Sequence, residues 1–432
     1  MKAYIDQVFI FLSQSTGWLW CVVVLFGTAA LAALIWQAKP KRRTRWLVIV
    51  GGSGIALAAI LVIPYALMAS RYRVPHGPFR VQQAILVLPA GGSDRFAAPI
   101  LMQIWYPTAT ALRPTPRLDN CAALQSLALA AANNARRLIL YMPHLAGRRD
   151  DNSTRLSYLA SFGYVAVAFD DIAQDPKPVD ARPEEEAERF EKGIDYTQED
   201  YERTIGHYNN RVRRQAEKAL SGLGRLAACA SANTASPWSN GIDYAHVGFL
   251  GFSFGGSTAT EAAAIDNRIV AVVNLDGLLF GQAFEGHASV PYLFVRSGRP
   301  FSTMRSMMSK DPVERYLSRI VDRDLREEVR LTAQLGSAGI LIKGSAHLDL
   351  SDAVFEPHAS RLWLFHNPIA FYNAVNLYTR DFFDARLMGK PAFLVGQRSS
   401  PIPVVQSFRE IGLTPGGNGK LSPLQDANGA PI

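Results

Sequence analysis

A Gly-Phe-Ser-Phe-Gly pentapeptide occupies residues 251–255, and its central Ser253 is the strongest candidate for chemistry in the chain. A serine between two glycines at this spacing is typical of a nucleophile elbow, in which a strand turns sharply into a helix and exposes the hydroxyl. The flanking sequence fits that turn. Residues 245–250 are mostly apolar, as in a buried strand, and residues 256–264 are mostly small, as in a helix packed against a sheet. We therefore expect Ser253 to be a nucleophile.

A serine hydroxyl needs a histidine base and a carboxylate that orients the base. In the expected order along the chain the nucleophile comes first, then the acid and then the histidine. Among the histidines after Ser253, His347 is the one that directly follows a good strand candidate, residues 339–343. Asp276 stands at the end of another apolar run, residues 269–275. Each residue alone also fits an ordinary surface or turn position. Together, however, Ser253, Asp276 and His347 each follow a strand candidate and occur in the required order, which predicts a catalytic triad.

Four short motifs carry a resemblance to a known family. They are Gly-Phe-Ser-Phe-Gly-Gly at 251–256, Asn-Leu-Asp-Gly at 274–277, Lys-Gly-Ser-Ala-His at 343–347 and Met-Gln-Ile-Trp-Tyr-Pro at 102–107. In these motifs the chain resembles the plasma-type platelet-activating factor acetylhydrolases, a branch of the α/β-hydrolases. The elbow is shared with many hydrolases, whereas the acid one strand later and the Gly-Ser-x-His loop are more specific to this family. The resemblance covers about residues 75–390.

The resemblance implies that Ser253 is the nucleophile, Asp276 the acid and His347 the base. It implies an enzyme without a metal or another cofactor that cleaves short or oxidised acyl chains from phospholipids. The distant bacterial members of the family are mostly esterases of unknown substrate.

We expect two backbone N–H groups to form the oxyanion hole. The first is expected from Phe254, the residue after the nucleophile. The second is expected from the loop after the strand candidate at residues 138–142. The family usually has His-Gly in this loop, followed by the donor. Here Leu145 replaces the glycine after His144, so the resemblance assigns the donor to Ala146.

The soluble part predicts an α/β-hydrolase fold with a mostly parallel sheet and helices on both faces. The strand candidates are residues 100–106, 138–142, 164–169, 246–250, 269–275, 292–295 and 340–342. We expect this catalytic domain to span residues 71–395, with a polar insertion near residues 175–208. Residues 300–335 are less regular, and their methionines suit core or surface filling better than an acyl pocket. Pro, Gly, Ser and Asn dominate residues 396–432, which predicts a disordered tail.

Residues 1–70 predict a different kind of structure, a two-helix transmembrane anchor. Residues 17–37 and 46–68 are nearly uncharged, and each run is long enough to cross a bilayer. Tryptophan and tyrosine near their ends suit the membrane interface. A cleaved signal peptide is the alternative for the first run, but the run is too long and a second run follows at once.

The loop at residues 39–45 carries five Lys or Arg side chains, which places it on the cytoplasmic side of an inner membrane. The catalytic domain is then extracytoplasmic, although Arg71, Arg73 and Arg80 favour the opposite orientation. This loop also supplies five of the chain's net charge of +8. The remainder shows no basic and aromatic stripe, so we expect no nucleic-acid partner.

Three cysteines are few for 432 residues. Cys21 lies in the first apolar run, whereas Cys121 and Cys229 both lie in the catalytic domain and are either free or bonded to each other. None has metal-ligand spacing with the histidines.

These observations predict a membrane-anchored serine esterase acting through an acyl-enzyme on short-chain or lipid-type esters. An acyltransferase or amidase with the same triad is one alternative. A membrane-tethered binding domain with an inactive hydrolase fold is another.

Overall fold

The computed structural model describes Gly52 and residues 74–88, 99–172, 198–285, 289–299, 301–355 and 368–414. By its contacts the chain divides into a large unit, residues 75–353 and 374–432, and a small unit, residues 1–74 and 354–373. The described part of the small unit contains an apolar cluster of Val354, Phe355, Ile369 and Tyr372.

The two predicted membrane spans, at residues 17–37 and 46–68, lie outside the described residues except for Gly52. Within the described ranges, no helix combines the length and the apolar character that crossing a bilayer requires. The anchor therefore stays a prediction from the sequence.

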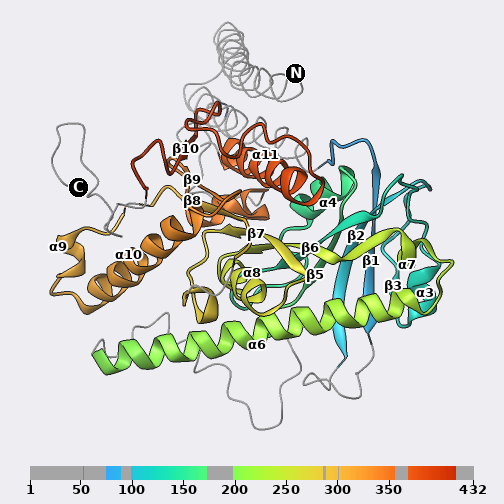
Figure 1. The fold of residues 1–432 in the computed structure, drawn as a ribbon, viewed down its shortest axis with the longest axis horizontal. Helices are drawn as coiled ribbons and strands as arrows, with labels where there is room; N and C mark the ends of the chain where they lie inside the picture. Colours follow the sequence, from blue (N-terminus) through green and yellow to red (C-terminus); the bar gives the residue numbers. More distant parts are fainter. Residues whose placement is uncertain are drawn as a thin grey trace, which may run out of the picture. The chain divides into compact units, whose positions relative to one another are not determined.

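The large unit is built on a ten-stranded sheet in the order β10-β9-β8-β7-β6-β4-β5-β2-β1-β3 (Figure 1). Its strands are β1 (Arg80–Leu88), β2 (Ile100–Thr108), β3 (Arg117–Leu118), β4 (Arg136–Met142), β5 (Val165–Phe169), β6 (Ile242–Phe252), β7 (Ile269–Leu275), β8 (Tyr292–Ser297), β9 (Ala338–Ile342) and β10 (Val405–Ser407). All neighbouring pairs from β5 through β4, β6, β7 and β8 to β9 are parallel. Strand β2 is antiparallel to β1 and β5, and β10 is antiparallel to β9. The mostly parallel sheet expected from the sequence is confirmed.

The burial of the strands explains why the sequence identified most of them. Strand β5 is buried at every position, as a strand covered on both faces must be, and it reads as a continuous apolar run. Strand β1 instead alternates between buried and more accessible positions. Its apolar signal is weaker, and this strand was not predicted from the sequence.

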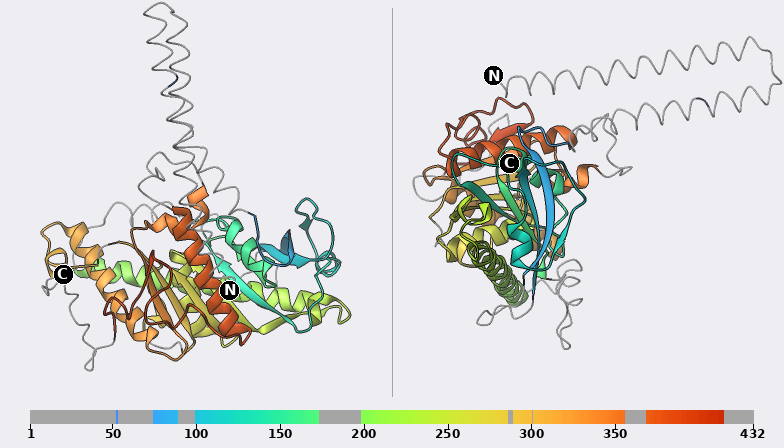
Figure 2. Two further views of the ribbon diagram at one scale, coloured as in Figure 1. Left: turned by 90° about the horizontal axis from the view of Figure 1, so that it is seen from above. Right: turned by 90° about the vertical axis from the view of Figure 1, so that its right-hand side faces the viewer.

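Helices cover both sides of this sheet. They are α3 (Cys121–Gln125), α4 (Ser153–Ser161), α6 (Gln198–Ser231), α7 (Pro237–Asn240), α8 (Phe254–Ile265), α9 (Met304–Met307), α10 (Pro312–Thr332) and α11 (Pro368–Leu387), with short 3-10 turns η2 (Gly281–Ala283), η3 (His347–Leu350) and η4 (Asp352–Phe355). Figure 1 and the right-hand view of Figure 2 place α6 and the later part of α11 on opposite sides of the sheet. Helices on both faces agree with an α/β-hydrolase fold.

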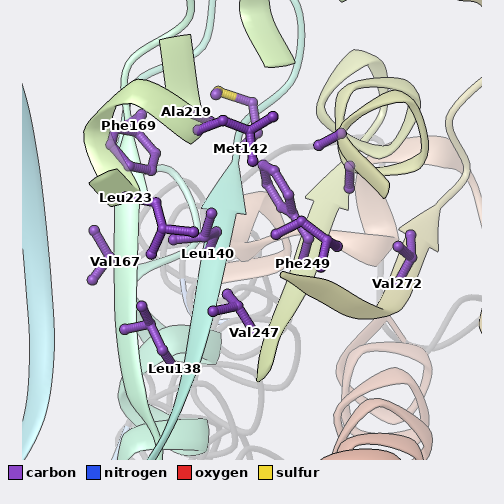
Figure 3. Packing of buried hydrophobic residues seen from close by; sticks show 14 of the residues in the cluster. Leu138, Leu140, Met142, Val167, Phe169, Ala219, Leu223, Val247, Phe249 and Val272 are labelled. Carbon is purple, nitrogen blue, oxygen red and sulfur yellow. The ribbon is translucent and has the colours of Figure 1, made fainter. Parts of the chain in front are cut away.

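The core beneath α6 is formed by alternate residues of the central strands. Leu138, Leu140 and Met142 of β4 point to this side together with Phe169 of β5, and Leu223 of α6 packs on them (Figure 3). All five side chains are fully buried. Burying a large apolar side chain contributes about 1.5–3 kcal/mol, so this layer fixes the sheet on which the candidate site lies.

One expectation about the chain's organisation is corrected. Residues 396–414 are not a disordered tail, because β10 pairs with β9 and Phe408 is buried, with its N–H donating to Gly339 O at 2.8 Å. A few apolar residues among prolines and glycines were enough to add this edge strand. Of the predicted polar insertion, residues 198–208 belong to α6, and residues 173–197 lie outside the described residues.

A disulfide joins Cys121 of α3 to Cys229 near the end of α6. The two Cα atoms are 5.1 Å apart, within the normal range for a disulfide, and the bond closes a separation of 108 residues. The pairing that the sequence left open is present in the structure.

Candidate active site

Ser253 lies at the turn between β6, which ends at Phe252, and α8, which begins at Phe254. Its φ is 56°, a left-handed conformation that strains any residue other than glycine. The flanking glycines are required by close backbone contacts. A Cβ on Gly251 would lie 1.9 Å from Gly255 O, and one on Gly255 would lie 2.0 Å from Met142 O. The sharp strand-to-helix turn expected at this pentapeptide is confirmed.

Asp276, after β7, and His347, in the loop after β9, contact each other at one edge of the sheet. Asp276 directly follows β7, and its Oδ2 accepts a hydrogen bond from His347 Nδ1 at 2.7 Å. Its Oδ1 accepts the N–H of Ser297 at 2.9 Å. Because Nδ1 is held by the carboxylate, Nε2 is the imidazole nitrogen left for another partner.

The surroundings of Asp276 favour its ionised form. Burial alone raises the pKa of a carboxyl group, but here the hydrogen bond and charge of His347, the Arg296 guanidinium and the Ser297 N–H outweigh burial. The pKa of Asp276 is therefore held well below its ordinary value. The carboxylate stays charged at neutral pH and can stabilise an imidazolium.

The imidazole of His347 lies close to the nucleophile elbow. It stacks on the ring of Phe252, the residue before Ser253, with the ring centroids 4.8 Å apart. Ser253, Asp276 and His347 line one cavity. The described part of the chain gives the Ser253 hydroxyl no hydrogen bond to the imidazole, and such bonds in hydrolases often shorten only when substrate is bound. The structure brings the three predicted residues to one place.

The loop that carries His347 is fixed by groups that were not predicted from the sequence. The N–H of Ala346 donates to Asp349 Oδ2 at 2.7 Å. Arg155, a fully buried residue of α4, donates from Nη1 to Leu350 O at 2.6 Å and from Nε to Asn376 Oδ1 at 2.7 Å. The only sign of this role in the sequence is that Arg155 is a charged residue among the apolar positions of a short amphipathic helix.

The loop between β4 and α4 contains the predicted oxyanion donor. Ala146 has a φ of 57°, and the next N–H, from Gly147, donates to His144 O at 2.8 Å. The ring of His144 contacts Leu145 O through Nδ1 at 2.8 Å and Asp151 Oδ2 through Nε2 at 3.1 Å. Through these contacts the His144 ring braces the loop. Leu145 lines the cavity and Ala146 does not, so the donor assignment stays a prediction.

The cavity around Ser253 has a volume of about 300 Å³. Its apolar side is an aromatic cluster in which Tyr208 stacks on Phe280 at 5.2 Å and contacts Phe254 edge-on at 5.9 Å. Ile320 and Val321 of α10 complete this side. These residues come from four separate elements and were missed from the sequence, although the spacing within α10 marks one apolar helix face.

The polar side of the cavity contains a buried ion pair. Arg296 Nη1 lies 2.9 Å from Glu328 Oε2, and the Glu328 side chain is 4% exposed. Burial raises the pKa of Glu328 to about 7, although the Arg296 guanidinium lowers it. The Arg296 guanidinium also lowers the pKa of Asp276, so its charge acts on both carboxylates.

Two other predictions concern residues near the site. Met304 and Met308 are 68% and 72% exposed and do not line the cavity, so surface filling is the better description. In the described part of the chain, no group of three or more His, Cys, Asp or Glu side chains could hold a metal ion.

Comparisons with known proteins support the fold. No family model matches the chain, and no curated protein matches it. Among solved structures, the chain is similar to the ferulic acid esterase from Streptomyces cinnamoneus, with a TM-score of 0.52 and 19% sequence identity. The match covers 77% of this chain and 98% of that chain. The similarity shows the fold of an α/β-hydrolase and does not single out the platelet-activating factor acetylhydrolase branch.

Proposed function

We propose that the protein is a serine carboxylic-ester hydrolase in which Ser253, His347 and Asp276 act as nucleophile, base and acid. The observation that carries the proposal is the 2.7 Å hydrogen bond between His347 and Asp276, in the cavity that Ser253 also lines. A strained serine, a fixed imidazole and an ionised carboxylate in one cavity are the parts that acyl transfer to a hydroxyl requires.

The chemistry follows from these positions. Ser253 Oγ attacks the ester carbonyl while His347 Nε2 takes its proton, and the imidazolium is stabilised by Asp276. The oxyanion accepts hydrogen bonds from the N–H groups of Phe254 and Ala146. The tetrahedral intermediate collapses, the ester C–O bond breaks, and His347 protonates the leaving alcohol. Water, deprotonated by His347, then attacks the acyl-enzyme and releases the acid and Ser253.

The size of the cavity favours small acyl groups. About 300 Å³ is at the lower end for pockets that bind small molecules, and an aromatic cluster closes its apolar side. Short-chain esters, including the short acyl groups of lipid-type esters, fit this space better than long chains. The ferulic acid esterase named above adds a compact aromatic acyl group to the esters worth assaying. The platelet-activating factor acetylhydrolase-like assignment rests on the four sequence motifs.

We also place the catalytic domain outside the cytoplasm, anchored by two membrane spans at residues 17–37 and 46–68. The basic loop at residues 39–45 supports this orientation. The disulfide between Cys121 and Cys229 gives independent support, because disulfides persist in oxidising compartments. A periplasmic reporter fused after Ile432 should be active, and activity of a cytoplasmic reporter there would reverse the orientation.

A fluorophosphonate probe tests the enzyme assignment. Wild-type protein should be labelled at Ser253, and Ser253→Ala should take up no label while keeping the thermal unfolding of the wild type. Absence of labelling in the wild type, or labelling that survives Ser253→Ala, would overturn the assignment.

Substrate assays then define the reaction. Hydrolysis of p-nitrophenyl esters should be fastest for short acyl chains and should fall as the chain grows beyond the cavity. Added alcohol acceptors distinguish hydrolysis from acyl transfer. A dominant ester product in water containing a dilute acceptor would make the protein an acyltransferase.

A further inference from the structure

The cavity beside Ser253 has charged and polar lining residues in addition to its aromatic cluster. Three of them lie in a short segment at the end of β8, namely Arg296, Ser297 and Arg299. A purely hydrocarbon acyl group has no polar atoms that could pair with the charged and hydroxyl groups of this segment.

The two arginines of this segment have different surroundings. Arg296 is paired with Glu328 at 2.9 Å, so its charge is balanced within the protein. Arg299 is exposed and lines the same cavity, and it has no acidic partner among the described residues. The remaining carboxylate at the cavity, Asp276, is occupied by His347. Arg299 is thus the unbalanced charge of the site.

Two hydroxyl groups in the same cavity also lack partners. Ser257, one helical turn after Ser253, is 0% exposed, and Ser297 is 2% exposed. Neither Oγ has a hydrogen-bond partner within the described part of the protein, and both residues line the cavity. A buried hydroxyl without a partner costs about 1–3 kcal/mol. These hydroxyls are therefore suited to hydrogen-bond a polar substituent of a ligand.

From these observations we infer that the cavity selects esters that carry a carboxylate, which Arg299 binds as its counter-ion. The apolar part of such a substrate packs on the cluster around Tyr208 and Phe280. The hydroxyls of Ser257 and Ser297 form hydrogen bonds with its polar atoms. This inference rests on the proposed esterase function. The carboxylate can belong to the acyl part, as in the half-ester of a dicarboxylic acid, or to the alcohol part.

The test compares substrates matched in length. The mono-4-nitrophenyl ester of glutaric acid carries the carboxylate on the acyl side, and methyl 4-nitrophenyl glutarate is its neutral counterpart. The butanoyl ester of 4-hydroxybenzoate carries the carboxylate on the leaving-group side, with the butanoyl ester of methyl 4-hydroxybenzoate as its neutral control. We expect wild-type kcat/KM to be about tenfold higher for the acidic member of at least one pair, mainly through KM.

Variants of Arg299 test whether this residue causes the preference for acidic substrates. Arg299→Gln should bring the acidic-to-neutral ratio of kcat/KM close to one, Arg299→Glu should invert it, and Arg299→Lys should restore most of it. Arg305→Gln is the matched control, because Arg305 is an exposed arginine of α9 that does not line the cavity. It should keep the wild-type ratio. The preference should also decrease with added salt, since Arg299 is exposed to solvent.

The outcomes separate this inference from the proposed function. Labelling by a fluorophosphonate together with hydrolysis of neutral esters, but no preference for either acidic substrate, would overturn the role of Arg299 and leave the esterase intact. A preference that persists in Arg299→Gln would also overturn it. Absence of labelling and of all hydrolysis would instead remove the proposed function.

Discussion

The two sides of the cavity are built in different ways. The proposed catalytic side contains Ser253 and Asp276, which directly follow β6 and β7, and His347, which lies in the loop after β9. The binding side comes from helices α6, α8 and α10 and from the turn around Phe280. Parallel strands bring their carboxyl ends to one edge by the geometry of the sheet. Helices that meet over this edge depend on packing between segments distant in the chain.

This difference implies different consequences of mutation. A change on the catalytic side should affect the chemical step and leave discrimination between substrates unchanged. A change on the binding side should alter that discrimination and preserve the chemistry. Each experiment below sharpens this comparison or contradicts it.

The largest effect is expected for Asp276→Asn on the catalytic side. An amide at this position holds His347 in the wrong tautomer, so kcat should fall about 10⁴-fold while KM changes little. The substitution keeps the shape of the side chain. Hydrolysis of p-nitrophenyl acetate and butanoate should decrease by the same factor, and thermal unfolding shows whether the fold is kept. Unchanged kinetics would remove Asp276 from the site.

The next largest effect is expected on stability, from removing the disulfide that ties α6, a helix of the binding side, to α3. Cys121→Ser combined with Cys229→Ser removes the bond that closes 108 residues and ties α6 to α3. Loss of a disulfide over a loop of this length should lower the free energy of unfolding by about 4 kcal/mol. Because Tyr208 lies near the other end of α6, kcat/KM of the folded protein should be retained. Urea unfolding with parallel assays measures both, and a loss of activity without a loss of stability would contradict this separation.

A smaller and more selective effect is expected for Leu317→Trp on the binding side. Leu317 of α10 lines the cavity and is 44% exposed, so a larger ring there occupies cavity space without disturbing the core. We expect kcat/KM for hexanoyl esters to fall about tenfold, a difference of about 1.4 kcal/mol, with acetyl esters little affected. Leu335→Trp is the control, because Leu335 is 97% exposed and does not line the cavity. Equal losses for both chain lengths would assign Leu317 to the catalytic side.

The same contrast explains what the sequence could predict. The elbow, the acid and the histidine each sit next to a continuous apolar run, so a local pattern identified both the strand and the residue at its end. All seven predicted strands are present. Strands β1, β3 and β10 were missed, because β1 alternates in burial and the edge strands β3 and β10 contain only two and three residues.

The binding side could not be derived in this way. Nothing local to Tyr208, Phe280 and Ile320 shows that their side chains converge, since this depends on how α6 and α10 lie over the sheet. The same applies to Arg155, whose buried guanidinium fixes the His347 loop through Leu350 O. Pairing across about 195 residues is tertiary information that one sequence does not contain.

The smallest effect is expected for Ala146→Gly, which concerns the oxyanion loop. Ala146 has a φ of 57°, and glycine adopts this conformation without the cost of about 1–2 kcal/mol that a Cβ incurs. The gain is offset by the greater freedom of glycine in the unfolded chain, about 0.5–1 kcal/mol. The proposed donor is a backbone N–H, which glycine keeps, so kcat should stay within about threefold of the wild type.

Ala146→Val is the matched opposite, because a β-branched residue is strongly disfavoured at positive φ. It should lower kcat for all acyl chain lengths by a similar factor, as expected of the catalytic side, and measuring kcat and KM for acetyl and hexanoyl esters checks this. If Ala146→Gly instead altered the preference for chain length, the loop would belong to the binding side. The second donor of the oxyanion hole would then be a group other than the N–H of Ala146. The N–H of Leu145 is the nearest alternative, because Leu145 lines the cavity.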